Sequence, residues 1–249
     1  DAGNLSLEGL KNIENTACPN EGSCGGMFTA NTMASISEAI GLALPGSASP
    51  PAEDDRREKM VYDSGVACTK LLEINLRPKE ILTFEAFENA IVMLNSVGGS
   101  TNGILHLLAL ASEVNIKLTY DDFERIRKKT PHLADMKPGG NYVMNSLDKI
   151  GGIPFVLKKL LDKGLLNENC LTATGKTIKE NLDAMSFSAP DQHIVRSVEN
   201  PLHSVGTAVV LKGSLAPEGA VIKTAGVEMT KFTGKARVFD REEYAFDAV

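Results

Sequence analysis

"ENTACPNEGSCGGMFTANTM", residues 14–33, contains the pattern that decides the fold of this chain. A glycine-rich loop with two thiols, Cys18 and Cys24, runs into apolar residues spaced by three and four, which predicts an amphipathic helix over residues 27–44. The N–H groups and dipole of a helix start favour an anion, so a Cys24 thiolate would be stabilised there. Such a thiolate serves as a nucleophile, a redox thiol or a soft-metal ligand; the alternative is a small buried hydrophobe.

Helical patterns continue to about residue 190. "LPGSASPPAEDD", residues 44–55, ends the first helix because proline and glycine interrupt it, and a second helix is predicted over about 53–75. "ILHLLALASEV", residues 104–114, is apolar nearly all round, so we expect it to be buried on several sides. Four more helices are predicted: one from an N-cap at Thr83 with Phe84, Phe87, Ile91 and Leu94 as its buried stripe, one from the Thr119 and Asp122 capping box, and two over 142–150 and 153–163.

The character of the chain changes after about residue 190. "TAVVLKGSLAPEGAVIKTAG", residues 207–226, and "KARVF", residues 235–239, are short Val- and Ile-rich runs separated by Gly and Pro, which predicts strands joined by turns, with a tight turn at "PEGA". We therefore predict an α/β fold in two parts. Residues 1–190 form the mainly helical later part of an α/β domain, and residues 191–249 form the start of a β-barrel-like domain.

Composition excludes several classes of protein. Apolar residues make up 43% of the 249 and charged residues 23%, as in ordinary globular proteins. The net charge of −6 and the lack of a Lys/Arg cluster argue against nucleic acid as a partner. No apolar run is long enough to span a membrane, and four scattered cysteines do not make a disulfide scaffold. A cytoplasmic setting is expected.

Two further stretches have binding potential. "GGSTNG", residues 98–103, places Ser100, Thr101 and Asn102 at a predicted helix start, where they could hold a carboxylate or phosphate or simply cap the helix. "CLTATGKT", residues 170–177, has Cys170 where a phosphate-binding loop needs its first glycine, so that reading is disfavoured.

The remaining cysteines and the histidines are predicted to be structural. Cys68 lies mid-helix and is expected in the core, and Cys170 precedes a turn with no evident partner. None of the histidines has a metal-type partner four residues on, so we expect structural roles for His106, His132, His193 and His203.

Five stretches, in their order along the chain, resemble the dihydroxy-acid dehydratase family: "ENTACPNEGSCGGMFTANTM", "LPGSASPPAEDD", "GGSTNGILHLLALA", "CLTATGKT" and "GSLAPEGAVIKTAG". The resemblance covers essentially the whole chain. It implies a hydro-lyase that converts 2,3-dihydroxy-3-methyl-branched acids to 2-oxo acids in valine and isoleucine biosynthesis. In these enzymes the iron of a [2Fe–2S] cluster, or of a [4Fe–4S] cluster in some members, acts as a Lewis acid on the departing hydroxyl, while Mg²⁺ holds the substrate and a serine removes a proton.

The resemblance implies that Cys24 is a cluster ligand, whereas Cys18 has no counterpart in the sugar-acid relatives and is treated as a neighbour. The family's other cluster cysteines, its Cys-Asp-Lys motif, its magnesium ligands and its catalytic serine have no match here. Together with the start at Asp1, this leads us to expect a fragment that is inactive alone. The resemblance also implies a homodimer or higher homo-oligomer. The alternatives are a non-catalytic binding module with the same fold and a sugar-acid dehydratase of the same superfamily.

Overall fold

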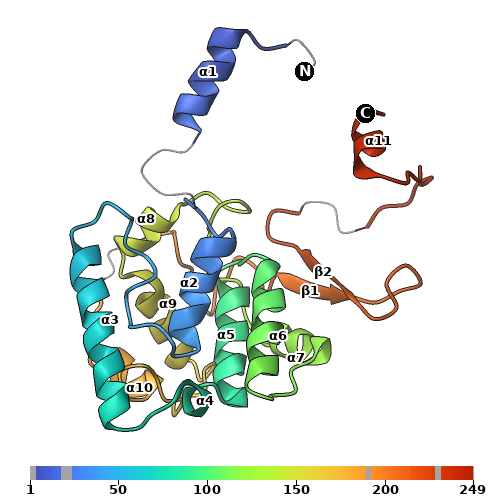
Figure 1. Cartoon of the computed structure of the whole chain (residues 1–249). Helices are drawn as coiled ribbons and strands as arrows, with labels where there is room; N and C mark the ends of the chain where they lie inside the picture. Colours follow the sequence, from blue (N-terminus) through green and yellow to red (C-terminus); the bar gives the residue numbers. More distant parts are fainter. Residues whose placement is uncertain (1–3, 18–23, 189–191, 228–230, 249) are drawn as a thin grey trace.

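The computed structural model describes residues 4–17, 24–188, 192–227 and 231–248. These residues form a mainly helical body followed by one small antiparallel strand pair (Figure 1). The elements are α1 (Leu7–Thr16), α2 (Thr29–Ala39), α3 (Arg56–Glu73), α4 (Pro78–Ile81), α5 (Phe84–Ser96), α6 (Asn102–Glu113), α7 (Tyr120–Arg127), α8 (Met144–Asp148), α9 (Gly152–Leu161), α10 (Ile178–Asp183), β1 (Ala208–Leu211), β2 (Ala220–Lys223) and α11 (Glu242–Phe246).

Helix α5 is the centre of the core. Its N-cap is Thr83, as predicted, and the hydroxyl oxygen of Thr83 accepts a hydrogen bond from the Ala86 N–H over 3.3 Å. Almost every residue of α5 from Ala86 onward is buried, because α2, α6 and α7 pack around it. The predicted stripe is confirmed at Phe87, Ile91 and Leu94, whereas Phe84 is half-buried.

The expectation that residues 104–114 would be buried on several sides is wrong. In α6 the Leu105 side chain is 63% exposed and His106 is also exposed, while Ile104, Leu107 and Ala111 face α2 and α5. The apolar pattern of α6 was wide enough to suggest several neighbours, but helices cover only one of its sides. The helix that is buried nearly all round is α5.

Helix α3 confirms the predicted helix over 53–75 to within a few residues, but the position predicted for Cys68 is wrong. None of the residues of α3 is buried, and Cys68 is exposed. Burial needs a neighbouring element, and α3 lies along one side of the helical body (Figure 1). Helix α1, which we did not predict, also buries no residue and lies apart from the body, as does α11.

The shorter helices begin where the sequence predicts. At α7, Asp122 Oδ2 accepts the Thr119 N–H over 3.0 Å, which completes the predicted capping box. Helices α8 and α9 confirm the two short helices predicted over 142–150 and 153–163. "CLTATGKT" folds as a turn in which the Thr172 N–H bonds to the Lys176 carbonyl, before Thr177 caps α10.

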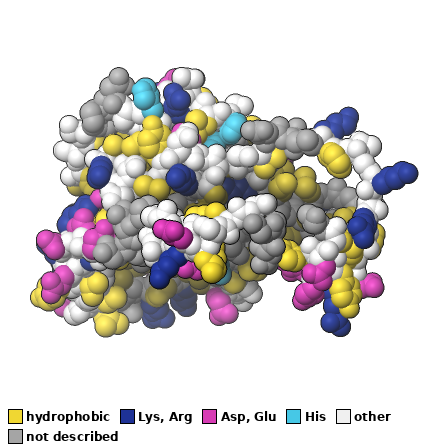
Figure 2. Space-filling view, turned by 90° about the horizontal axis from the view of Figure 1, so that it is seen from above, with side chains coloured by type: hydrophobic (Ala, Val, Ile, Leu, Met, Phe, Trp, Pro, Cys, Tyr) yellow, Lys and Arg dark blue, Asp and Glu magenta, His cyan; other side chains and the backbone are white. Residues whose placement is uncertain are grey.

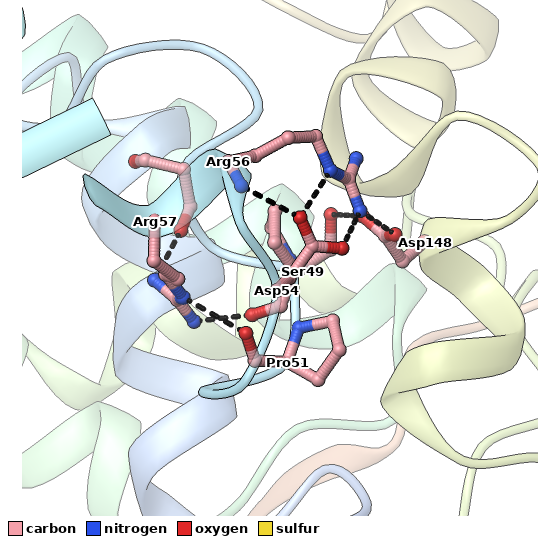
Figure 3. A network of polar contacts seen from close by, with 8 residues as sticks. Ser49, Pro51, Asp54, Arg56, Arg57 and Asp148 are labelled. Carbon is pink, nitrogen blue, oxygen red and sulfur yellow. Dashed lines mark hydrogen bonds and ion pairs between the residues drawn. The ribbon is translucent and has the colours of Figure 1, made fainter. Parts of the chain in front are cut away.

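The loop between α2 and α3 is held by charged side chains. Ser49 Oγ donates to Asp148 Oδ1 over 2.9 Å, and the Arg56 guanidinium bridges the carboxylates of Asp148 and Asp54 (Figure 3). Arg57 donates to three carbonyls of the same loop, those of Ser47, Pro50 and Pro51. On the side of the core, the buried carboxylate of Glu38 in α2 accepts the N–H groups of Gly46 and Ala48. The helix predicted over residues 27–44 is shorter in the structure, because α2 ends at Ala39 and Gly41, with φ 90, turns the chain away before Pro45 is reached. The contacts around Glu38, Arg56 and Arg57 then fix the path of the proline-rich loop.

The C-terminal strands form a single hairpin. β1 pairs antiparallel with β2 in a register that sets Ala208 opposite Lys223 and Leu211 opposite Ala220. The hairpin docks on α7, where Arg127 and Gly206 exchange backbone and side-chain hydrogen bonds. The tight turn predicted at "PEGA" is confirmed, because the Gly219 N–H donates to the Ala216 carbonyl over 3.2 Å, and it is the last part of a longer connection over 212–219.

The strand predicted at "KARVF", residues 235–239, is absent from the described part of the chain. These residues are largely exposed and have no strand beside them, and a strand needs a ladder partner for its backbone groups. The change from helical to strand-forming sequence after about residue 190 is confirmed at β1 and β2 only.

Candidate functional site

The turn that carries Cys24 is held at every carbonyl. Asn31 Nδ2 donates to the carbonyl oxygens of Cys24 over 2.6 Å and Gly26 over 2.8 Å, and the Met144 N–H donates to that of Gly25 over 2.7 Å. Lys223 Nζ reaches the Met27 carbonyl over 3.4 Å. Four successive peptide groups are therefore fixed by three separate parts of the fold: α2, the start of α8 and β2.

Met27 is the anchor of this turn. Its side chain is fully buried in the core cluster, and its N–H donates to the Lys137 carbonyl over 2.6 Å. The Cys24 thiol is half-buried, and Sγ donates to the Gly26 carbonyl over 3.2 Å. The thiol thus lies in a loop just before α2, as the sequence predicts, and hydrogen bonds hold that loop in place.

Glycines let other segments approach the turn closely. A Cβ on Gly26 would lie 2.5 Å from the Lys137 carbonyl oxygen, whereas a Cβ on Gly25 would meet nothing within 4 Å. Gly98 has φ +61, and a Cβ there would lie 2.7 Å from His132 Nε2. Close approach of other segments therefore explains the glycines at 26 and 98, whereas nothing near Gly25 requires a glycine there.

The structure brings Ser100 and Asn102 to the start of α2. The Ser100 N–H donates to Thr32 Oγ1 over 2.9 Å, and Asn102 Nδ2 donates to Thr29 Oγ1 over 2.8 Å. Ser100 Oγ also accepts the N–H of Asn102 over 3.3 Å, a local turn contact. Thr101 is the N-cap of α6 and is half-buried, but its side chain makes no capping hydrogen bond. The "GGSTNG" loop thus lies against the first turns of α2, the helix that follows the Cys24 turn.

Several residues of this site were missed by sequence reasoning. Asn31 lies within the quoted stretch, and an Asn in the first turn of a helix that follows a Cys-Gly-Gly loop could have suggested a side-chain brace. Lys137, Met144 and Lys223 act through backbone groups or from the C-terminal strands, and no local pattern marks them.

The histidines divide into two groups. His132 is buried, stacks on His203 with ring centroids 5.3 Å apart, and has a pKa lowered to about 4, mainly by burial. His106 and His193 are exposed. The structural role predicted for His132 fits its packing between Gly98 and His203.

Among the described residues, Cys24 is the one cysteine in the turn before α2. Cys18 lies outside the described residues, Cys68 is exposed on α3, and burial raises the pKa of Cys170 to about 11. Over 4–17, 24–188, 192–227 and 231–248, no three or more His, Cys, Asp or Glu side chains are grouped so as to hold a metal ion. The described part of the chain therefore does not fit a complete metal centre, although Cys24 fits a single thiolate ligand.

Comparison with known proteins places both parts of this chain in one family of dehydratases. Residues 1–181 match the family described as dihydroxy-acid/6-phosphogluconate dehydratase N-terminal, and residues 193–249 match its C-terminal counterpart. The chain belongs to the dihydroxy-acid/6-phosphogluconate dehydratase family. Its Cys24 turn and its hairpin thus fall in the N-terminal and C-terminal matches, respectively.

Within this family, the similar curated proteins have one name. A protein from Sulfolobus acidocaldarius named dihydroxy-acid dehydratase is 56% identical over 249 residues, which is all of this chain and 44% of that protein. Relatives of the same name from Leifsonia xyli and Saccharolobus islandicus are 54% identical over 248 residues and 57% identical over 241. The chain spans 44% of the first two proteins and 43% of the third. No described helix has both the length and the apolar character that a membrane crossing requires.

Proposed function

We propose that this chain is part of a dihydroxy-acid dehydratase, a hydro-lyase that removes water from 2,3-dihydroxy-3-methyl-branched acids to give 2-oxo acids in valine and isoleucine biosynthesis. The observation that carries the proposal is the 56% identity to a protein of that name along the whole chain, Cys24 turn included. The chain's own contribution is a hydrogen-bonded turn that carries one thiol, followed by a helix whose first turns bind the "GGSTNG" loop.

The proposed role of Cys24 is to bind one iron of an iron–sulfur cluster, [2Fe–2S] in preference to [4Fe–4S]. The geometry supports this because the one hydrogen bond of Sγ to a described residue goes to the Gly26 carbonyl, and Cys24 stays partly exposed. When bound, such an iron supplies Lewis acidity toward the leaving hydroxyl. The other cluster ligands, the Mg²⁺ ligands and the catalytic serine would come from sequence beyond these 249 residues.

Ser100, Thr101 and Asn102 are proposed to contact the substrate. In support, their loop lies against the start of α2, next to the Cys24 turn. Asn102 and Ser100 already bond to each other and to α2, so a substrate would have to share or replace those contacts.

The division into a domain over 1–190 and the start of a β-barrel-like domain over 191–249 is part of the proposal. The separate family matches over 1–181 and 193–249 support it, and so does the single hairpin in the second part. We further propose a small-molecule substrate, a homodimer or higher homo-oligomer, and no nucleic-acid partner. On the face in Figure 2, Lys and Arg side chains lie scattered singly rather than gathered in one basic patch.

A sugar-acid dehydratase is the second candidate, because the matched family also includes 6-phosphogluconate dehydratases. A chimera separates the two. This chain would replace the matching segment of the Sulfolobus acidocaldarius relative, and formation of 2-oxo acid would be followed from 2,3-dihydroxyisovalerate and from gluconate.

We expect turnover of 2,3-dihydroxyisovalerate by the chimera and none by the 249-residue chain alone. Cys24→Ser in the chimera should abolish activity and lower the bound iron, whereas Cys68→Ser, at an exposed position, should change neither. Turnover of gluconate alone would support the sugar-acid candidate. A folded, iron-loaded chimera that is inactive on both substrates would favour the non-catalytic module.

A further inference from the structure

Lys223 is the only residue of the C-terminal strands that hydrogen-bonds to the Cys24 turn in the described part of the chain. Its Nζ reaches the Met27 carbonyl over 3.4 Å, across 196 positions of sequence. The other carbonyls of that turn are held from within the helical body, by Asn31 and Met144. Lys223 therefore links the second family match to the thiol of the first.

The environment of Lys223 differs from that of the surface lysines. Its side chain is half-buried, its pKa is lowered by burial alone, and it forms no ion pair with a described residue. Lys212 of the same hairpin, by contrast, pairs with exposed Asp121 over 2.7 Å. Partly burying an ammonium without a carboxylate is unfavourable, so a specific acceptor such as the Met27 carbonyl is needed to offset it.

The strand that carries Lys223 is itself firmly attached. Its pairing partner Ala208 is buried, and the Ala208 N–H donates to Asn95 Oδ1 of α5 over 3.1 Å. Beyond β2, a Cβ on Gly139 would lie 2.7 Å from the Ala225 carbonyl, so the chain after Lys223 lies directly against the loop that also holds Met27. The lysine thus extends from a fixed strand to a fixed turn.

We propose that Lys223 is a positioning residue that fixes the Cys24 thiol by holding the Met27 carbonyl. The contact stands independently of the proposed dehydratase function, and only the use made of the fixed thiol rests on that function. Met27 is buried and lies three residues from Cys24, so loss of its carbonyl partner should loosen the Met27 end of the turn while the core stays in place.

Thiol reactivity tests this without any cluster. In the 249-residue chain, Cys18 and Cys170 are replaced by Ser, so that iodoacetamide reports on Cys24 with exposed Cys68 as the internal reference. Peptide mass spectrometry gives the ratio of the two alkylation rates. Lys223→Met keeps the apolar stem and removes the donor, Lys223→Arg keeps the charge, and Lys212→Met is the matched control in the same hairpin.

We expect Lys223→Met to raise the Cys24-to-Cys68 ratio about fivefold, the factor of one ordinary net hydrogen bond, because at 3.4 Å the contact is longer than a charge-assisted one. Lys223→Arg should stay within about twofold of the parent, and Lys212→Met should not change the ratio. An unchanged ratio in Lys223→Met, or an equal rise in Lys212→Met, would overturn the proposal. Hydrogen exchange of the α5 amides is measured alongside, and a rise there equal to that at Cys24 would assign Lys223 to general stability and overturn it too.

Discussion

The side-chain amide of Asn31 donates a 2.6 Å hydrogen bond to the carbonyl oxygen of Cys24, seven residues earlier. The same Nδ2 donates to the Gly26 carbonyl over 2.8 Å, so one side chain in the first turn of α2 holds two of the four carbonyls of the thiol turn. The helix thereby fixes the loop that precedes it.

Asn31→Ala should lower the free energy of unfolding by about 1–3 kcal/mol, because two partly buried carbonyls lose their donor. The better helix propensity of Ala returns no more than about 0.7 kcal/mol. Asn31→Asp should be at least as damaging, since an ionised carboxylate cannot donate. Urea unfolding measures both, with Asn12→Ala on exposed α1 as the control. Equal midpoints for the Asn31 and Asn12 variants would show that the brace contributes nothing.

Gly26 and Gly25 form a matched pair for testing how tightly the turn is packed. A Cβ on Gly26 would lie 2.5 Å from the backbone oxygen of Lys137, which cannot move aside as a flexible side chain could, whereas Gly25 has open space around it. We expect Gly26→Ala to destabilise the chain by about 1–3 kcal/mol and Gly25→Ala to stay within about 0.5 kcal/mol. Thermal unfolding compares them, and a Gly25→Ala variant as unstable as Gly26→Ala would contradict the packing described here.

Local features of this fold could be predicted from the sequence because neighbouring residues determine them. The Thr83 N-cap, the Thr119 capping box and the position of Cys24 just before a helix all depend on residues a few positions away. The end of α2 is also local, but Gly41 with φ 90 marks it rather than the prolines that the sequence analysis named. Each of these sequence signals depends on hydrogen bonds within a single turn of backbone.

Burial could not be predicted equally well, because it depends on which distant segments pack where. Leu105 and Cys68 lie in helical patterns that suggested a core position, and both are exposed because no described element covers their faces. For Lys223 the sequence analysis missed a contact instead, because its hydrogen bond to Met27 spans 196 residues and no local sequence pattern marks it. The Cys24 thiol could therefore be identified from sequence, but its supports could not.

Glu38 should give the stability of the chain a pH dependence between about pH 4.5 and 7. Burial raises its pKa from 4.5 to about 7 although two N–H groups, from Gly46 and Ala48, donate to it. A carboxyl whose folded pKa is raised stabilises the fold fully below its unfolded pKa, and that contribution is lost as pH rises to the folded pKa. The loss should reach about 3 kcal/mol.

Glu38→Gln should remove this slope, because the amide does not titrate. Urea unfolding of parent and variant from pH 4.5 to 7.5 gives the difference. Glu180→Gln is the control: the pKa of Glu180 is lowered by its hydrogen bonds from Thr177, so its contribution is lost only as pH falls and the slope between pH 4.5 and 7 should persist. A Glu38→Gln variant that keeps the parent's slope would place the titrating group elsewhere.

The Arg56 and Asp148 pair should couple more strongly than an ordinary surface ion pair. Their side chains meet at 2.5 Å, and that of Asp148 is only 9% exposed and also accepts from Ser49, whereas Lys59 and Asp63 form an exposed i,i+4 pair on α3. In double-mutant cycles we expect a coupling of about 1–2 kcal/mol for Arg56→Met with Asp148→Ala, against at most about 0.5 kcal/mol for Lys59→Met with Asp63→Ala. Added salt should weaken the α3 pair more, because solvent screens it fully. Equal couplings for the two pairs would mean that the α2–α3 loop is held by the Arg57 and Glu38 contacts to its backbone instead.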